Sequence, residues 1–376
     1  MKKYIVGGGI LLILGGAFVL YRQFSPINSD TMGRRVIPRP SGSFDTDLPA
    51  ESIIAQDLDT PWGLVFLPDR SLLLTERPGR VVRISPAGVK MTVATLYQVQ
   101  EIGEGGLLGI DIHPDFSSNN LVYLYYTYRN DGNNTLNRVV QMRYESDSLS
   151  DEKIIVDQIP GASNHNGGRI KFGPDKRLYI TTGDAQEPSQ AQERDSLAGK
   201  ILRVNDDGTA ATGNPFNTKV YSYGHRNPQG LTWDEQGRLW ATEHGRSGIQ
   251  SGLDELNLIE PGKNYGWPDI EGDRERDGME TPRAHSGGSV TWAPGGATYL
   301  NGSIFFTGLR GRSLYEARVE GDTVTVTDHL QGTYGRIRDV IVGPDGMLYI
   351  ATSNEDGRGI PAASDDRIIR IHSSSL

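Results

Sequence analysis

The chain has 376 residues, of which 36% are hydrophobic and 47 are glycine, enough for the core of one large domain or two ordinary ones. Its formal net charge of −9 at pH 7 argues against a nucleic-acid partner, because binding to a phosphate backbone requires a basic face. The absence of cysteine excludes disulfides and thiolate metal sites.

The N-terminus begins with Met1-Lys2-Lys3 and continues as an apolar run from Tyr4 to Tyr21, close to the shortest length that can span a bilayer. No small-residue cleavage site follows cleanly, which favours a membrane anchor over a cleaved signal peptide. We therefore predict an anchor or signal segment over residues 1–24, a Pro- and Ser-rich linker over 25–50 and one folded domain over 51–376. Such a segment would place the folded domain outside the cytoplasm, anchored or secreted.

From residue 53 onward the sequence repeats one pattern. The unit is a short apolar segment, a turn that is usually Pro-Asp or Asp-Gly, and a second apolar segment. Six copies occur, and the fifth is degenerate: 62–76, 108–124, 168–182, 230–243, 296–307 and 338–352. Repeats of roughly 45–65 residues that each hold several strands are typical of radial blades.

Several copies are followed by a further segment in which basic and apolar residues alternate, over 79–84, 199–204 and 366–371. Alternation at period two is the signature of a β-strand. We see no convincing helical periodicity of any length after the N-terminal segment. The sequence therefore predicts an all-β fold, a six-bladed β-propeller.

In a propeller the first strand of each blade lines a central channel, and the residues before those strands meet at one face. Glu104, His165, Gln229 and Arg336 all stand just before a predicted first strand. Residues far apart in the sequence are thereby directed to one funnel.

His165 lies in Asn164-His165-Asn166-Gly167-Gly168-Arg169, and Asp184 follows the second apolar segment of the same copy. An imidazole oriented by a carboxylate is suited to general-base catalysis. Alone, a loop histidine is more often solvated or structural; its place at the funnel favours function.

Four arginines are also directed to this funnel: Arg226, Arg310, Arg336 and Arg338. Planar guanidinium groups match carboxylates, so their convergence in an acidic protein predicts a small polyanionic ligand. For any single arginine, a salt bridge between blades is the competing interpretation.

Over nearly all of residues 50–372 the chain resembles the soluble dehydrogenases of glucose and other aldoses that depend on pyrroloquinoline quinone (PQQ). The resemblance rests on the motifs at 103–109, 113–116, 164–169, 223–230, 264–268 and 336–341. It implies a six-bladed propeller that holds PQQ, a tricarboxylate, at the channel mouth and oxidises C1 of aldose sugars to lactones. It also implies an electron acceptor, either a quinone or a soluble carrier.

The resemblance assigns roles to individual residues. Arg226, Asn227, Arg336 and Arg338 would clamp the cofactor, and Arg310 stands where the family has a basic residue. His165 would take the proton of the anomeric hydroxyl group while a hydride passes from C1 to PQQ. Asp184 would orient the imidazole and stabilise its cation.

Glu104 and Asn164 would contact the sugar; they stand where glucose-type members have Gln and Asp. A catalytic Ca²⁺ would bind the backbone carbonyls of Gly245 and Arg246, the latter in place of a common proline. Asp254-Glu255 lies where the family can hold a structural calcium.

Two other functions remain open. A propeller of the same family without cofactor could serve as a glycan- or protein-binding module, which would need neither a base nor a cofactor clamp. A propeller lactonase or hydrolase would have a channel lined by Asp, Asn and Glu with few arginines. Tyr265 and Trp292 could form a sugar pocket wall or pack in the core.

Overall fold

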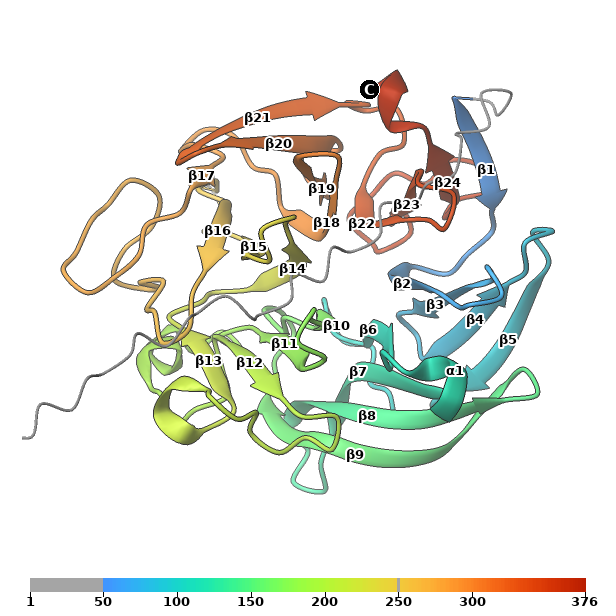
Figure 1. Ribbon diagram of the computed structural model, residues 1–376, viewed down its shortest axis with the longest axis horizontal. Helices are drawn as coiled ribbons and strands as arrows, with labels where there is room; N and C mark the ends of the chain where they lie inside the picture. Colours follow the sequence, from blue (N-terminus) through green and yellow to red (C-terminus); the bar gives the residue numbers. More distant parts are fainter. Residues whose placement is uncertain (1–49, 249–250) are drawn as a thin grey trace, which may run out of the picture. The chain divides into compact units, whose positions relative to one another are not determined.

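The computed structural model describes residues 50–248 and 251–376. Six antiparallel sheets of four strands each are arranged in a ring (Figure 1). The predicted all-β fold and the predicted number of blades are confirmed. The six sequence copies each supply the first two strands of one sheet.

The strands follow one another in sequence order within five of the sheets. The first sheet contains β2 (Pro61–Phe66), β3 (Leu72–Glu76), β4 (Arg80–Ile84) and β5 (Lys90–Thr95). The second contains β6 (Leu107–Ile112), β7 (Leu121–Arg129), β8 (Thr135–Glu145) and β9 (Ser148–Pro160). The third contains β10 (Ile170–Phe172), β11 (Leu178–Thr182), β12 (Lys200–Val204) and β13 (Val220–Tyr223).

The fourth sheet contains β14 (Pro228–Trp233), β15 (Leu239–Glu243), β16 (Glu255–Ile259) and β17 (Ala284–His285). The fifth contains β18 (Pro294–Leu300), β19 (Ser303–Gly308), β20 (Leu314–Glu320) and β21 (Thr323–His329). The described residues form one short α-helix, α1 (Phe116–Asn119), and three 3₁₀ turns at Pro188–Gln192, Pro215–Asn217 and Ser373–Ser375.

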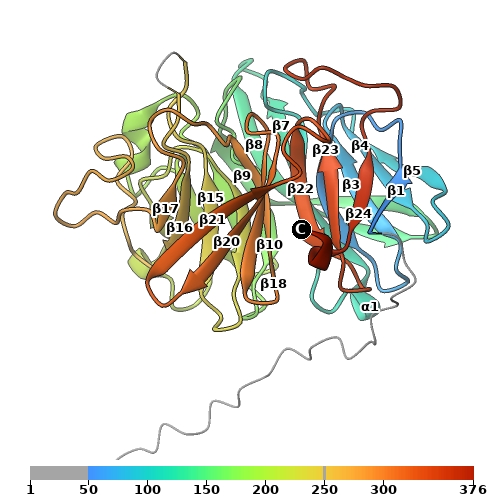
Figure 2. The ribbon, with the colours of Figure 1, turned by 90° about the horizontal axis from the view of Figure 1, so that it is seen from above.

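The sixth sheet joins the two ends of the described domain. Its order is β22 (Ile337–Val342), β23 (Leu348–Thr352), β24 (Ile368–Ile371) and then β1 (Glu51–Ala55). β1 lies beside β24 (Figure 2) and pairs antiparallel with it. In this pairing Glu51 lies opposite Ile371. Ring closure thus rests on hydrogen bonds between distant segments, a feature the repeats alone did not predict.

The hydrophobic core lies between neighbouring blades. For example, Leu73 and Val81 of the first sheet pack in one cluster with Leu124 and Val140 of the second, and all four are fully buried. Each such side chain contributes about 1.5–3 kcal/mol by leaving water. Stacked sheets therefore hold the loops at the channel mouth in fixed positions.

The predicted anchor or signal segment (1–24) and the linker over residues 25–50 lie outside the described residues, apart from residue 50. Among residues 50–248 and 251–376, no helix has the length and apolar character needed to cross a membrane.

Candidate active site

The third sheet brings His165 and Asp184 together. β10 and β11 pair antiparallel, so the residues before β10 and after β11 lie at the same end of the hairpin. The Nδ1 atom of His165 lies 2.7 Å from Oδ1 of Asp184. Gly183 permits this approach, because a Cβ atom there would lie 1.9 Å from the His165 carbonyl oxygen.

Asp184 fixes the orientation of the imidazole. Its carboxylate is fully buried and also accepts hydrogen bonds from the Trp267 indole at 2.8 Å and the Gln186 backbone at 2.8 Å. Because a carboxylate can only accept hydrogen bonds, the Nδ1 atom of His165 carries the proton and donates a hydrogen bond to Asp184. The Nε2 atom is then free to accept a proton. The His165 side chain is 17% exposed, so the ring remains accessible.

The backbone of His165 is held in an unusual conformation. Its φ of 61° lies in the left-handed region, which costs a residue other than glycine ~1–2 kcal/mol. The His165 N–H donates to Oε2 of Glu104 at 3.2 Å. The next residue, Asn166, is buried and accepts from Asn137 and the Ala162 backbone. These bonds offset the strain.

Arg226 and Asn227 enter the site just before β14. Oδ1 of Asn227 accepts from the Gly167 backbone at 2.9 Å, which ties Asn227 to the loop of His165. The Arg226 guanidinium donates to Ser247 at 3.0 Å and lies 5.3 Å from the Trp267 ring. Within the described part of the chain, the buried Nδ2 of Asn227 and Nε of Arg226 have no hydrogen-bond partner.

Arg338, in β22, also has a buried nitrogen without a hydrogen-bond partner in the described part of the chain. Its Nη1 donates to Gln229 at 2.7 Å, but its buried Nε has no partner in the described residues. Burial lowers the pKa of Arg338, and the charge of neighbouring Arg336 adds to that effect. The charge of Asp356 compensates only part of this effect, and an anionic ligand would stabilise the buried cation further.

The other two predicted arginines differ from these. Arg336 is paired with Asp356, which accepts from its Nε at 3.0 Å and its Nη2 at 2.6 Å. Arg310 is exposed and makes no ion pair with any residue in 50–248 or 251–376. The salt-bridge interpretation thus describes Arg336 in this structure, while Arg226 and Arg338 remain open to a ligand.

His244 is a site residue that the sequence reasoning missed. Its Nε2 is buried without a partner among the described residues. Burial lowers the pKa of His244 to about 3. The charge of Glu104 acts to raise this pKa, whereas those of Arg338, Arg226 and His165 act to lower it. These charged groups therefore lie near the His244 ring. The missed signal was its position directly after β15, comparable to that of Asp184 after β11.

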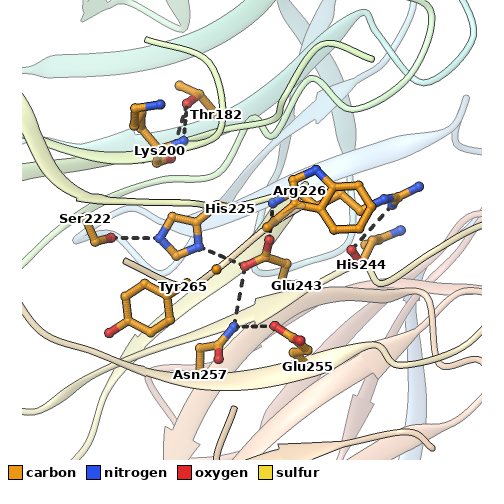
Figure 3. A network of polar contacts seen from close by, with 12 residues as sticks. Thr182, Lys200, Ser222, His225, Arg226, Glu243, His244, Glu255, Asn257 and Tyr265 are labelled. Atoms are coloured by element: carbon orange, nitrogen blue, oxygen red, sulfur yellow. Dashed lines mark hydrogen bonds and ion pairs between the residues drawn. The ribbon is translucent and has the colours of Figure 1, made fainter. Parts of the chain in front are cut away.

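A buried network lies behind Arg226 (Figure 3). Glu243 accepts from the Arg226 backbone N–H and lies 2.8 Å from Nδ1 of His225. The Nε2 of His225 lies 2.8 Å from the Ser222 hydroxyl group. Asn257 connects Glu243 to Glu255, with distances of 3.4 and 3.1 Å. The network fixes the backbone that presents Arg226.

Asp254 is hydrogen-bonded to the turn that contains the predicted calcium ligands, Gly245 and Arg246. Its carboxylate accepts from the backbone of Gly245 at 2.9 Å, of Trp292 at 2.6 Å and of Ala293 at 3.0 Å. Asp254 therefore shapes the turn of Gly245 and Arg246 by binding N–H groups. The described residues contain no group of three or more His, Cys, Asp or Glu side chains arranged to hold a metal.

The aromatic residues divide between core and site. Tyr265 stacks on His225 at 4.7 Å, and Trp292 packs against Phe306 and Tyr315. Both lie in the core, as the alternative interpretation held. The aromatic residue at the site is Trp267, which contacts Asp184 and Arg226.

The site combines an oriented base with four buried nitrogen groups that lack partners. Buried nitrogens without partners suit an anionic ligand, and the partly exposed imidazole of His165 is accessible to a second molecule.

Known proteins with similar sequences and folds include sugar dehydrogenases. The model of the family described as "Glucose / Sorbosone dehydrogenase" matches residues 58–368. The chain is 32% identical to the aldose sugar dehydrogenase YliI of Escherichia coli, over 81% of this chain and 90% of the relative. Its fold is similar to the PQQ-bound aldose sugar dehydrogenase of Streptomyces coelicolor, with a TM-score of 0.78, 41% identity, and coverage of 86% and 98%.

A structure from Thermus thermophilus, described as a putative glucose dehydrogenase, gives a TM-score of 0.81 and 42% identity, with coverage of 85% and 98%. A relative in Synechocystis of unassigned function is 35% identical over 81% of this chain and 84% of its own length.

Proposed function

The chain belongs to the glucose/sorbosone dehydrogenase family, and we propose that it is a PQQ-dependent aldose sugar dehydrogenase that oxidises C1 of aldoses to lactones. The observation that carries this proposal is the set of buried side-chain nitrogens at the site without partners in the part of the chain that the structure describes: Arg226 Nε, Arg338 Nε and Asn227 Nδ2, which are N–H donors, and His244 Nε2. Unpaired buried donors cost about 1–3 kcal/mol each, and a carboxylate-rich planar ligand would satisfy them.

His165 is the base of the proposed reaction. Its Nε2 takes the proton of the anomeric hydroxyl group, and Asp184 stabilises the imidazolium that results. When bound, PQQ supplies an acceptor for the hydride that leaves C1. A binding module would have no use for an imidazole with one nitrogen held by a buried carboxylate and the other open.

The residues fit the cofactor in charge and in hydrogen-bonding capacity. Arg226, Asn227 and Arg338 would hold its carboxylates, together with the neutral His244. Arg336 would contribute while it remains paired with Asp356, and exposed Arg310 would contribute from the rim. The backbone carbonyls of Gly245 and Arg246 would bind Ca²⁺. Because this ion takes six to eight oxygen ligands, the cofactor and water would supply the remaining ones.

Two further assignments remain predictions. The electron acceptor, a quinone or a soluble carrier, rests on the family resemblance. A location outside the cytoplasm rests on residues 1–24, beyond the described part of the chain.

The test is a titration of the purified domain with PQQ in the presence of Ca²⁺, followed by absorbance, and then dye reduction with a panel of aldoses. We expect saturable binding, sugar-dependent reduction and no activity without PQQ. Arg338→Gln should weaken PQQ binding at least ~10-fold, because it removes a charge-assisted hydrogen bond. Arg318→Gln, at an exposed position of β20, is the matched control. No binding and no activity in the unaltered protein would reject the proposal.

A further inference from the structure

A residue outside every motif reaches the predicted sugar site. Arg358 lies in the loop between β23 and β24 of the sixth sheet. Its Nη1 donates to Oε1 of Glu104 at 2.5 Å, and its Nη2 donates to Oδ1 of Asn164 at 3.0 Å. Glu104 precedes the second sheet and Asn164 the third, so Arg358 connects loops of three blades at one place.

The position of Arg358 is fixed from within its own loop. Asp356 accepts from the Arg358 backbone N–H at 2.9 Å and from both Nε and Nη2 of Arg336. Asn354 accepts from the Arg336 backbone at 2.8 Å. Although burial acts in the opposite direction, Arg336 and Arg338 hold the pKa of Asp356 below its usual range. The loop is thus tied to the arginines proposed to bind the cofactor.

Two of the three side chains are also connected to the segment that carries the base. Glu104 uses its second oxygen to accept from the His165 backbone at 3.2 Å, and Asn164 is the chain neighbour of His165. The Arg358 side chain is 51% exposed and the Glu104 side chain 17%. A guanidinium has five N–H donors, and Arg358 uses only part of them on Glu104 and Asn164. The remaining donors are open to a molecule that reaches His165.

We propose that Arg358 is a specificity-determining residue that, with Glu104 and Asn164, binds the hydroxyl groups at C2 and C3 of the aldose. This inference rests on the proposed function. A hydroxyl group both donates and accepts, so a carboxylate, an amide and a guanidinium held together match two neighbouring hydroxyls. Because Glu104 is hydrogen-bonded to the His165 backbone and Asn164 precedes His165 in the chain, the hydroxyls they bind lie beside the carbon whose hydroxyl group gives its proton to His165.

The charges favour a neutral sugar over a sugar acid or an amino sugar. Although burial acts in the opposite direction, the pKa of Glu104 is lowered to about 2, with Arg358 and the His165 backbone N–H both bonded to its carboxylate, so it is a carboxylate at any working pH. Its charge and that of Arg358 then compensate each other at 2.5 Å. A charged substituent would have to break this pair, whereas a hydroxyl group can share it.

The test measures kcat and KM of the PQQ-loaded protein for an aldose and its 2-deoxy and 3-deoxy analogues. We expect the unaltered protein to prefer the parent sugar over at least one analogue by ~10–100-fold in kcat/KM. In Arg358→Met this ratio should fall toward one, through a higher KM for the parent with kcat retained. Arg358→Lys should restore part of the preference.

The controls separate the possible failures. Arg318→Met removes an exposed arginine that also pairs with a glutamate, and it should leave the ratio unchanged. PQQ affinity and melting temperature of Arg358→Met should match the unaltered protein, since the side chain is half exposed. A preference that survives in Arg358→Met, or its absence from the unaltered protein, overturns the inference. Failure of the unaltered protein to oxidise any aldose rejects the proposed function instead.

Discussion

Two of the histidine–carboxylate pairs in the described part of the chain have similar geometry but different surroundings. His165 lies 2.7 Å from Asp184, and His225 lies 2.8 Å from Glu243. In both pairs the carboxylate is buried and faces Nδ1. In these respects the two pairs are alike.

The second nitrogen distinguishes them. The Nε2 of His225 is bonded to Ser222, its ring is stacked on Tyr265, and the residue is fully buried (Figure 3). The Nε2 of His165 has no partner among the described residues, and the ring is partly exposed. A carboxylate alone therefore does not make a histidine catalytic; an open nitrogen at the channel does.

The largest expected effect comes from removing the open imidazole. His165→Ala should lower kcat by ~10²–10⁴, the usual contribution of a general base, with PQQ affinity kept. Steady-state dye reduction and an absorbance titration on the same preparation measure the two quantities. Full activity in this variant would remove His165 from the mechanism.

Changing the partner of that imidazole should cost less. Asp184→Asn keeps the shape but loses the charge that stabilises the imidazolium, so kcat should fall roughly 10–10³-fold. The pH–rate profile should also change, because the neutral amide no longer fixes the tautomer at Nδ1. An unchanged rate and profile would show that Asp184 does not act through His165.

Breaking the closed pair should affect stability and cofactor binding rather than chemistry. Glu243→Gln loses the charge that His225 and the Arg226 backbone share, and it should lower the free energy of unfolding by about 1–3 kcal/mol. PQQ affinity should fall, while kcat of the loaded enzyme stays close to normal. Denaturant unfolding and kcat at saturating PQQ separate these outcomes; a loss confined to kcat would contradict the structural role.

The smallest effect concerns pH. Burial, together with the charge of Glu243, raises the pKa of Glu255 above its usual 4.5. The folded state then binds this proton more tightly than the unfolded state, so the free energy of unfolding should fall as pH rises above about 4.5. Unfolding in denaturant at about pH 5 and about pH 8 measures the slope. Glu255→Gln should flatten it, and an identical slope in that variant would exclude Glu255 as the source.

Local patterns predicted much of the molecule. Turn residues and strand alternation repeat within each blade, so six copies predicted six sheets. The hairpin of β10 and β11 places His165 near Asp184 because both stand at its open end. These features depend on residues close in sequence, where periodicity and turn chemistry carry the information.

The features that were not predicted depend on distant contacts. β1 completes the last blade from the other end of the domain. Arg358 meets Glu104 across 254 residues, and its exposed position in a loop gives no periodic signal. Whether an arginine is paired, as Arg336 is, or left open, as Arg338 is, depends on which side chains the ring closure brings beside it.

The central claim is that His165 removes the proton of the anomeric hydroxyl group while C1 is oxidised. The most direct measurement mixes PQQ-loaded protein with an aldose, or with its 1,5-anhydro analogue that lacks this hydroxyl group, and follows the absorbance of the bound cofactor in a single turnover. The account predicts reduction of the cofactor by the aldose and none by the analogue, although the analogue competes for binding. Reduction at equal rates by both compounds, or by neither, would contradict it.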